Sequence, residues 1–274
     1  DEKVDDIDLS TNLKPENVIE ILKNSKINYF DSGIDHGTVT AVINKKSFEI
    51  TTLRKDIKTD GRHADVKYTE DWLEDASRRD FTINSIYSDI EGNLFDPFNG
   101  KKDLRDGKIK FIGDPSTRIK EDYLRILRYI RFFLGYNKNQ QHNNIIKIIK
   151  QNLIGLNKVS KERQLQELKK IILIDDFYKI NSDKILKDLF LLIFPELKNI
   201  NRLNKLGNFR KEILKNKNFE FILSLLLIDK SDDCEYFMYK FNLSNKEKDK
   251  INFLNSIFSN ELDKNFFTKE KLMK

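Results

Sequence analysis

Apolar and polar residues alternate with a period of two through the first third of the chain, which predicts a sheet. The runs TVTAVI and SFEITTL flank the turn-like Asn44-Lys45-Lys46 and predict a hairpin, and SIYSDI and LFDPF around Glu91-Gly92-Asn93 predict a second one. A strand around residues 7–9 would point Asp6 and Asp8 to one side, because successive strand side chains alternate between faces.

One helix is predicted within this sheet region. The segment PENVIEILKN begins at Pro15, a residue favoured in the first helical turn. Its apolar positions, Val18, Ile19, Ile21 and Leu22, are expected to form a buried stripe.

After Gly113 the period changes to about 3.6 residues and stays helical almost to the end of the chain. Asp114-Pro115 makes a capped start for one long helix, STRIKEDYLRILRYIRFFLGY. The expected core-facing positions of this helix are Leu124, Leu127, Ile130 and Leu134. Further helices are predicted at IIKIIKQNL, SKERQLQELKKIIL, DKILKDLFLLIF, FEFILSLLLI, CEYFMYKF and KEKDKINFLNSIF, with NKNQQHNN and KNINRLNKLGN as connections.

The change of period predicts a domain boundary. We expect an α/β head with a mixed sheet over residues 1–113, a helical neck over 114–172, and a helical body and tail over 173–274. Of the 274 residues, 39% are hydrophobic and 34% are charged, and no apolar run is long enough to cross a membrane. The single Cys234 and the absence of an apolar signal segment among the first residues favour a cytoplasmic location.

Charge is distributed unevenly along the chain. Residues 1–113 hold 18 Lys and Arg against 23 Asp and Glu, a balance of −5, and residues 114–274 hold 32 against 21, a balance of +11. An acidic front half suits metal binding, and a basic rear half suits a polyanion such as RNA. Lysine-rich, solvated helix faces explain the rear-half charge equally well.

Asp6 and Asp8 are the first candidates for chemistry, and Glu49 is the third acid. Glu49 lies between Phe48 and Ile50, so it points away from their side of the strand. Magnesium prefers a few carboxylates together with phosphate oxygens, and phosphoryl transfer needs such cations. Taken alone, an exposed acidic strand edge is the more common explanation of an Asp-x-Asp pattern.

The segment RRDFTIN is the second candidate. Its two arginines, Arg78 and Arg79, can hold phosphate oxygens, Asp80 can accept from ribose hydroxyls, and Asn84 can donate to a triphosphate. Taken alone, a surface ion-pair cluster is the more common explanation.

The segment EDYLR and two arginines after it are the third candidate. Asp122 and Arg125 are three residues apart, so on one helix they would share a face and could present an acceptor and a fork of donors to a base. Arg128 and Arg131 would continue round the same helix toward phosphates. Such an Asp–Arg pair is usually a helix salt bridge, and arginines on a helix usually face solvent.

Order and spacing together identify a family. The blocks DDIDLST, DHGTVTAV, FEITTLR, DGRHADV, RRDFTINSIY, LFDPFNGKKDLRDGKIKFIGDP, RIKEDYLRILRYIRFF and VSKERQLQELKKIIL resemble, in this order, the class II tRNA nucleotidyltransferases, the bacterial CCA-adding enzymes. The resemblance runs from about residue 4 to residue 173 and implies a head of the DNA polymerase β type.

The resemblance also implies roles for the candidate residues. Asp6 and Asp8 would hold two Mg²⁺ ions with Glu49 nearby. Arg78, Arg79, Asp80 and Asn84 would bind ribose and triphosphate, Asp122 and Arg125 would pair with the base of CTP or ATP, and Arg128 and Arg131 would steady the phosphates. The segment LRKDIKTDGRHADV would be the flexible loop that helps the enzyme switch from C to A addition.

The function implied is addition of CCA, from CTP and ATP, to the 3′ end of tRNA, with no membrane partner. The alternatives are a bacterial poly(A) polymerase and a catalytically impaired tRNA-binding fragment. The last arises because members of the family carry a Gly-Gly strand before the Asp-x-Asp block, whereas this sequence begins at Asp1. Backbone N–H groups of such a turn bind phosphate, so its absence would be expected to weaken nucleotide binding.

Overall fold

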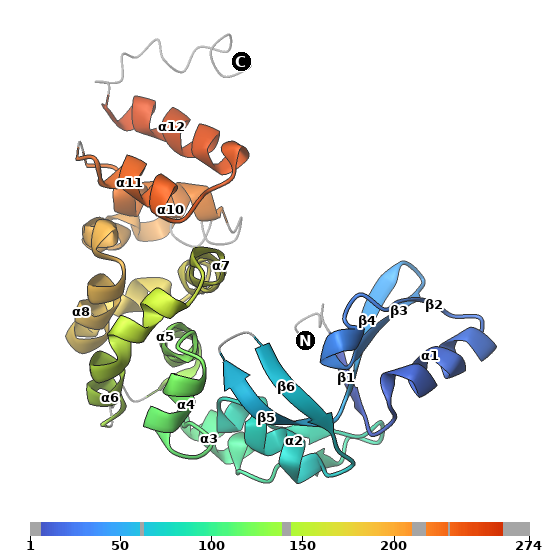
Figure 1. Cartoon of the computed structure of the whole chain (residues 1–274). Helices are drawn as coiled ribbons and strands as arrows, with labels where there is room; N and C mark the ends of the chain where they lie inside the picture. The colour runs from blue at the N-terminus through green and yellow to red at the C-terminus, as the bar shows by residue number, and fades with distance from the viewer. Residues whose placement is uncertain (1–6, 61–62, 139–143, 210–217, 230, 260–274) are drawn as a thin grey trace. The chain divides into compact units, whose positions relative to one another are not determined.

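A computed structural model describes residues 7–60, 63–138, 144–209, 218–229 and 231–259, coloured along the chain in Figure 1. The chain divides into two compact units, one formed by Asp1–Asp106 with Lys110–Asp122 and the other by Gly107–Ile109 with Tyr123–Lys274. Among the described residues, no helix has the length and apolar character needed to cross a membrane.

The first unit contains a four-stranded mixed sheet, which confirms the predicted fold class. Its strands are β1 (Asp8–Thr11), β2 (Asn28–Phe30), β3 (Thr38–Ile43) and β4 (Lys46–Thr52), in the spatial order β1-β4-β3-β2. β1 pairs with β4 in parallel and the other pairs are antiparallel. The β3–β4 hairpin was predicted, and its two-residue turn has positive φ at Asn44 (52°) and Lys45 (64°), as a twisted hairpin requires.

Helix α1 (Pro15–Asn24) packs on one face of this sheet (Figure 1). Val18 and Leu22 form a core with Val39 and Ala41 of β3. Ile19 packs against this core, but the prediction for Ile21 was wrong, since its side chain is 51% exposed. At about 100° per residue, Ile19 and Ile21 lie at opposite edges of the stripe that Val18 and Leu22 define, and the core extends over the edge that holds Ile19.

The segment expected to be a flexible loop forms paired strands instead. Strands β5 (Arg54–Asp60) and β6 (His63–Tyr68) make an antiparallel hairpin with an irregularity between Asp56 and Lys58. The expectation of a loop was wrong because the sequence of β5, RKDIKTD, contains a single apolar residue, Ile57, and therefore lacks the apolar alternation that marks a half-buried strand. The other predicted hairpin is confirmed as two short strands, β7 (Tyr87–Ser88) and β8 (Leu94–Phe95).

Short helices complete the first unit. They are α2 (Trp72–Arg78), α3 (Gly100–Asp106) and α4 (Pro115–Glu121), with single 3-10 turns at Ile34–His36 and Thr82–Asn84. Asp71 caps α2 and Asp114 caps α4, each by accepting a hydrogen bond from a backbone N–H of the first turn.

The long helix predicted after Asp114 is broken in two. Between α4 and α5 (Arg125–Tyr136), Asp122 has φ −149° and ψ 106°, an extended conformation that ends the first helix. The division between the compact units falls at this break, whereas the sequence places a boundary at Gly113. Further division of the second unit into neck, body and tail stays a prediction.

The second unit is helical, as predicted. Leu124, Leu127, Ile130 and Leu134 are all buried, which confirms the stripe on α5. The other predicted helices are present as α6 (Ile145–Asn152), α7 (Lys161–Ile172), α8 (Lys184–Ile193), α10 (Phe219–Leu227), α11 (Asp233–Lys240) and α12 (Asn245–Ser259).

Three segments of 3-10 helix join these helices: Leu153–Lys158, Phe177–Ser182 and Pro195–Phe209. The last covers KNINRLNKLGN, so the expectation of an irregular connection there was wrong. Buried residues such as Leu197, Ile200 and Leu203 explain the helical turns. Most of NKNQQHNN lies outside the described residues.

Candidate functional site

Asp8 and Glu49 lie directly across from each other on the parallel strands β1 and β4. The residues that follow them, Leu9 and Ile50, are also paired, and Ile50 packs against the core under α1. Because strand side chains alternate, the two carboxylates lie on the sheet face opposite α1, and both residues are exposed. The structure therefore brings these two predicted acids together on an open face.

This pair has the chemistry of a divalent cation site. Neighbouring strands lie about 4.8 Å apart, so side chains in register can share one hard cation through carboxylate oxygens. The third predicted acid, Asp6, lies outside the described residues. Within the part of the chain that the structure describes, no group of three or more acidic, His or Cys residues could hold a metal, and Asp8 and Glu49 would supply two ligands of a larger set.

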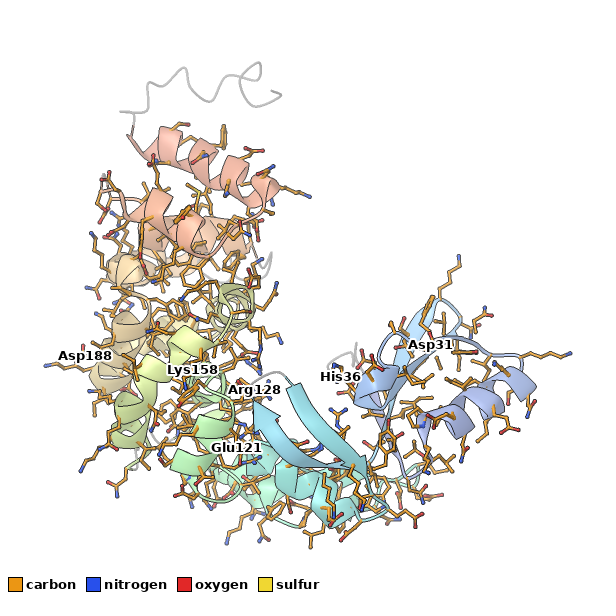
Figure 2. The ribbon with its side chains drawn as sticks, in the orientation of Figure 1. Asp31, His36, Glu121, Arg128, Lys158 and Asp188 are labelled. Atoms are coloured by element: carbon orange, nitrogen blue, oxygen red, sulfur yellow. The ribbon has the colours of Figure 1, made fainter. Side chains whose placement is uncertain are left out.

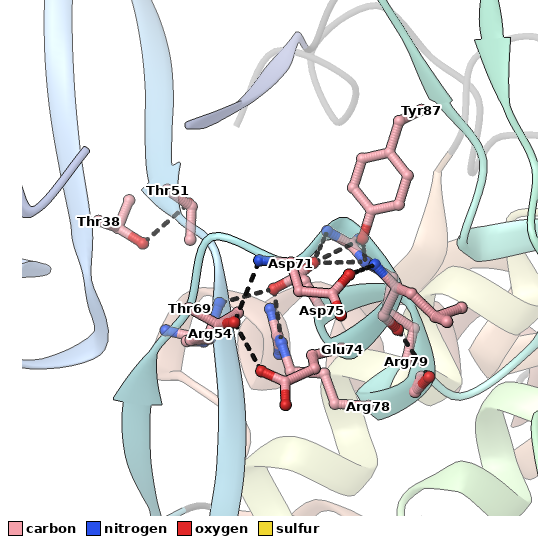
Figure 3. A network of polar contacts seen from close by, with 12 residues as sticks. Thr38, Thr51, Arg54, Thr69, Asp71, Glu74, Asp75, Arg78, Arg79 and Tyr87 are labelled. Atoms are coloured by element: carbon pink, nitrogen blue, oxygen red, sulfur yellow. Dashed lines mark hydrogen bonds and ion pairs between the residues drawn. The ribbon is translucent and has the colours of Figure 1, made fainter. Parts of the chain in front are cut away.

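Arg78 and Arg79 are organised around one buried carboxylate (Figure 3). Asp75 of α2, only 2% exposed, accepts hydrogen bonds from Arg78 Nε at 2.9 Å and from Arg79 Nη2 at 3.2 Å. It also accepts from the Tyr87 hydroxyl at 2.6 Å and from the backbone N–H of Arg54 at 3.1 Å. The arginines thus form an ion-pair cluster, but one centred on a buried acid.

The Asp75 network shifts the acidity of its members. Burial alone would raise the pKa of Asp75, but the charge of Arg78 and the hydrogen bond from Tyr87 outweigh it and hold this pKa below its usual value. Burial and the hydrogen bond to Asp75 raise the pKa of Tyr87 to about 12. Asp75 is therefore charged and Tyr87 is a neutral donor at neutral pH.

Asp80 and Asn84 are also brought together. Asp80 is buried and its Oδ1 accepts hydrogen bonds from Asn84 Nδ2 at 3.0 Å and from the backbone N–H of Phe81 at 2.9 Å. The 3-10 turn Thr82–Asn84 makes this contact possible, because it folds the chain back by one turn between the two residues.

Arg118 of α4 ties the arginine segment in place. Its Nη2 donates to the backbone carbonyl oxygens of Arg78 and, at 2.6 Å, of Arg79, while its Nη1 pairs with Glu121. Arg78, Arg118 and Glu121 also line a polar pocket of about 500 Å³, together with Lys55, Asp56, Asp71, Leu73, Glu74 and Ser77. Arg79 and Asp80 are not among its lining residues.

Asp122 and Arg125 do not share a face of one helix, so that part of the prediction was wrong. Asp122 is the extended residue after α4, and Arg125 is the buried first residue of α5. The two belong to different compact units. Their predicted pairing with a nucleotide base stays a prediction.

Arg128 and Arg131 of α5 are held by a second buried carboxylate. Glu167 of α7, 3% exposed, accepts a hydrogen bond from Arg131 Nε at 2.8 Å and lies 3.9 Å from Arg128 Nη1. Both guanidinium groups lie over the Phe132 ring, 5.5 Å from its centroid for Arg128 and 4.2 Å for Arg131. Figure 2 labels Arg128 among the side chains of the helical unit. The predicted phosphate-binding arginines of this unit are thus fixed from one side.

Sequence reasoning missed the residues that hold the arginines. Asp75 precedes Arg78 and Arg79 by three and four positions on one helix, a spacing that could have revealed it. Glu167 and Arg118 lie too far along the chain from their partners to leave any local signal.

Comparison with known proteins connects these features to a family. A family described as "Poly A polymerase head domain" matches residues 1–110. The human mitochondrial CCA tRNA nucleotidyltransferase 1 is 46% identical over 173 residues, which are 62% of this chain and 40% of the relative. The CCA-adding enzyme of Staphylococcus epidermidis is 28% identical over 253 residues, 89% of this chain and 58% of the relative. The chain spans about two fifths of the length of the curated relatives named CCA tRNA nucleotidyltransferase 1.

Solved structures agree over almost the whole chain. The Bacillus stearothermophilus CCA-adding enzyme in complex with CTP has a TM-score of 0.72 at 25% identity, covering 99% of this chain and 65% of that one. A tRNA nucleotidyltransferase complexed with a primer tRNA and an ATP analog has a TM-score of 0.73 at 21% identity, covering 97% of this chain and 81% of that one. At this identity the likeness is one of fold. The chain is thus similar to the poly A polymerase head domain over residues 1–110 and to CCA-adding enzymes over most of its length.

Proposed function

We propose that the chain adds CCA, from CTP and ATP, to the 3′ end of tRNA. The observation that carries the proposal is the in-register pair Asp8 and Glu49 on the open face of a sheet that belongs to this family's head domain. The relatives named as CCA-adding enzymes, and the related structures with CTP, an ATP analog and tRNA, support the same substrates.

The reaction joins the 3′ hydroxyl of the RNA to the α-phosphorus of the nucleotide and releases pyrophosphate. Mg²⁺, held by Asp8 with Asp6 and Glu49, would lower the barrier by neutralising phosphate charge when bound. The chain's own residues position the reactants: Arg78 and Arg79 bind the triphosphate, and Asp80, oriented by Asn84, accepts from the ribose.

Base choice would fall to Asp122 and Arg125, with Arg128 and Arg131 on the phosphates. Since Glu167 binds Arg131 through Nε, the outer N–H groups of that guanidinium are the ones left to reach a phosphate. The basic second unit would bind the tRNA by charge and shape. The cytoplasm is the proposed compartment, although relatives named as mitochondrial exist.

The test uses the purified chain with Mg²⁺, tRNA lacking its CCA end, and labelled CTP with ATP. Addition of C, C and A, abolished by EDTA and by Asp8→Ala, is the expected result. Failure of Asp8→Ala to reduce incorporation would refute the site.

Poly(A) addition is the second candidate, because the matching head-domain family bears that name. A run of A from ATP alone, with no use of CTP, would favour it. Binding of tRNA without any nucleotide incorporation would instead favour a non-catalytic tRNA-binding role.

A further inference from the structure

Three arginines meet at one buried carboxylate in the first unit. Arg78 and Arg79 bond Asp75 through their side chains, and Arg54, the first residue of β5, bonds it through its backbone N–H (Figure 3). The cluster thus contains three positive charges against the negative charge of Asp75 and that of Asp56, which acts on Arg54. In the first unit, this is an excess of positive charge beside β5, a strand of the two-stranded β5–β6 sheet.

Arg54 makes the excess unusual. Its Nε and Nη1 are buried and have no hydrogen-bond acceptor among the described residues. Burial, followed by the charge of Arg78, lowers the pKa of Arg54, as expected for a cation crowded against another cation. A guanidinium in this state is stabilised by any anion that enters the cluster.

Asp75 divides its two oxygens between the parts of the cluster. Oδ1 accepts from Arg78 and from the backbone of Arg54, and Oδ2 accepts from Arg79 and Tyr87. Arg78 donates to Oδ1 of Asp75 through Nε. Among the described contacts, the Nη groups of Arg78 are therefore available to bind a ligand. One carboxylate therefore sets the spacing of α2, β5 and β7 around the arginines.

We propose that Asp75 is a positioning residue that assembles the three arginines into a single site for the triphosphate of the incoming nucleotide. The inference rests on the proposed function. The excess of positive charge leaves the site complementary to the β- and γ-phosphates, and the buried carboxylate holds the guanidinium groups of Arg78 and Arg79 together. Asp75 acts through the arginines and does not itself contact the substrate.

The experiment replaces Asp75 by Asn in the full chain and measures binding of CTP and CMP with Mg²⁺ by calorimetry. Asn keeps the shape but loses the charge. CTP affinity should fall about tenfold, or about 1.4 kcal/mol. CMP affinity should fall much less, because CMP lacks the two outer phosphates. Arg54→Gln should lower the ratio of CTP to CMP affinity in the same direction.

Glu74→Gln is the matched control. Glu74 neighbours Asp75 on α2, and its carboxylate pairs with Lys55 at 2.8 Å rather than with an arginine. Its substitution should leave the CTP-to-CMP ratio unchanged. A purely structural role for Asp75 would reduce the fraction of binding-competent protein without changing this ratio.

Tyr87→Phe decides the matter if Asp75→Asn does not fold. It removes only the hydroxyl that donates to Oδ2 and accepts from Arg79 Nε at 3.0 Å. A lowered ratio supports the proposal, and a ratio equal to that of the unmodified chain overturns it. Failure of the unmodified chain to bind CTP would instead overturn the proposed function, so the two failures are distinguishable.

Discussion

Truncation of Glu167 to Ala should destabilise the helical unit strongly. The change removes the carboxylate that lies 2.8 Å from Arg131, 3.9 Å from Arg128 and 3.6 Å from Lys170. Removing one partner of a buried ion pair costs about 3–5 kcal/mol. Lys170 is 58% exposed and can rehydrate, whereas Arg131 is 20% exposed and loses the carboxylate at its Nε. The lower end of this range therefore applies.

For a unit of this size, about 3 kcal/mol corresponds to a fall in Tm of about 6–12 °C. Circular dichroism at 222 nm during heating would measure it. Glu162→Ala is the control, since Glu162 is exposed on the same helix. Equal melting temperatures for the two variants would refute the reasoning. A double replacement, Glu167→Leu with Arg131→Met, should recover much of the loss, because an apolar pair can replace a buried ion pair at little cost.

The other predictions concern the head and the core of α5. Gly100→Ala should lower stability by about 3 kcal/mol or more in thermal melts, because the new Cβ would lie 2.1 Å from the backbone carbonyl oxygen of Thr82, which cannot move as a side chain can. Asp75 has a lowered pKa in the folded chain, so its contribution to stability is complete above about pH 5 and is lost as the pH falls through this pKa. The difference in Tm between the unmodified chain and Asp75→Asn should therefore shrink below about pH 4. Leu127→Ala should cost about 2–5 kcal/mol in urea unfolding, because Leu127 is fully buried, and a loss under 1 kcal/mol would contradict its place in the core.

Much of the fold could be predicted because local patterns determined it. The alternation in TVTAVI and SFEITTL predicted β3 and β4, and the parallel pairing of β4 with β1 sets Glu49 beside Asp8. The helical period predicted all six later helices within the described residues, since each carries an apolar stripe.

The failures have a different physical origin. No Gly or Pro marks the position of the break at Asp122 in the sequence. The helical period of apolar residues therefore continues through it unchanged. The β5–β6 hairpin is held by backbone pairing of a mostly polar strand, β5, and side-chain patterns do not reveal such pairing. Glu167 reaches the arginines of α5 only after α5 and α7 pack together, and such a tertiary partner is invisible to spacing.

The attachment of Arg118 to the carbonyl oxygens of residues 78 and 79 has a practical consequence for protein engineering. Because the acceptors are peptide carbonyl groups, these hydrogen bonds do not depend on which side chains positions 78 and 79 carry. Substituted versions of positions 78 and 79 can therefore keep the same backbone path and report only the altered side-chain chemistry. Replacing Arg118 has the opposite effect. It removes the hydrogen bonds that fix the backbone at positions 78 and 79, while the side chains of these two positions stay the same.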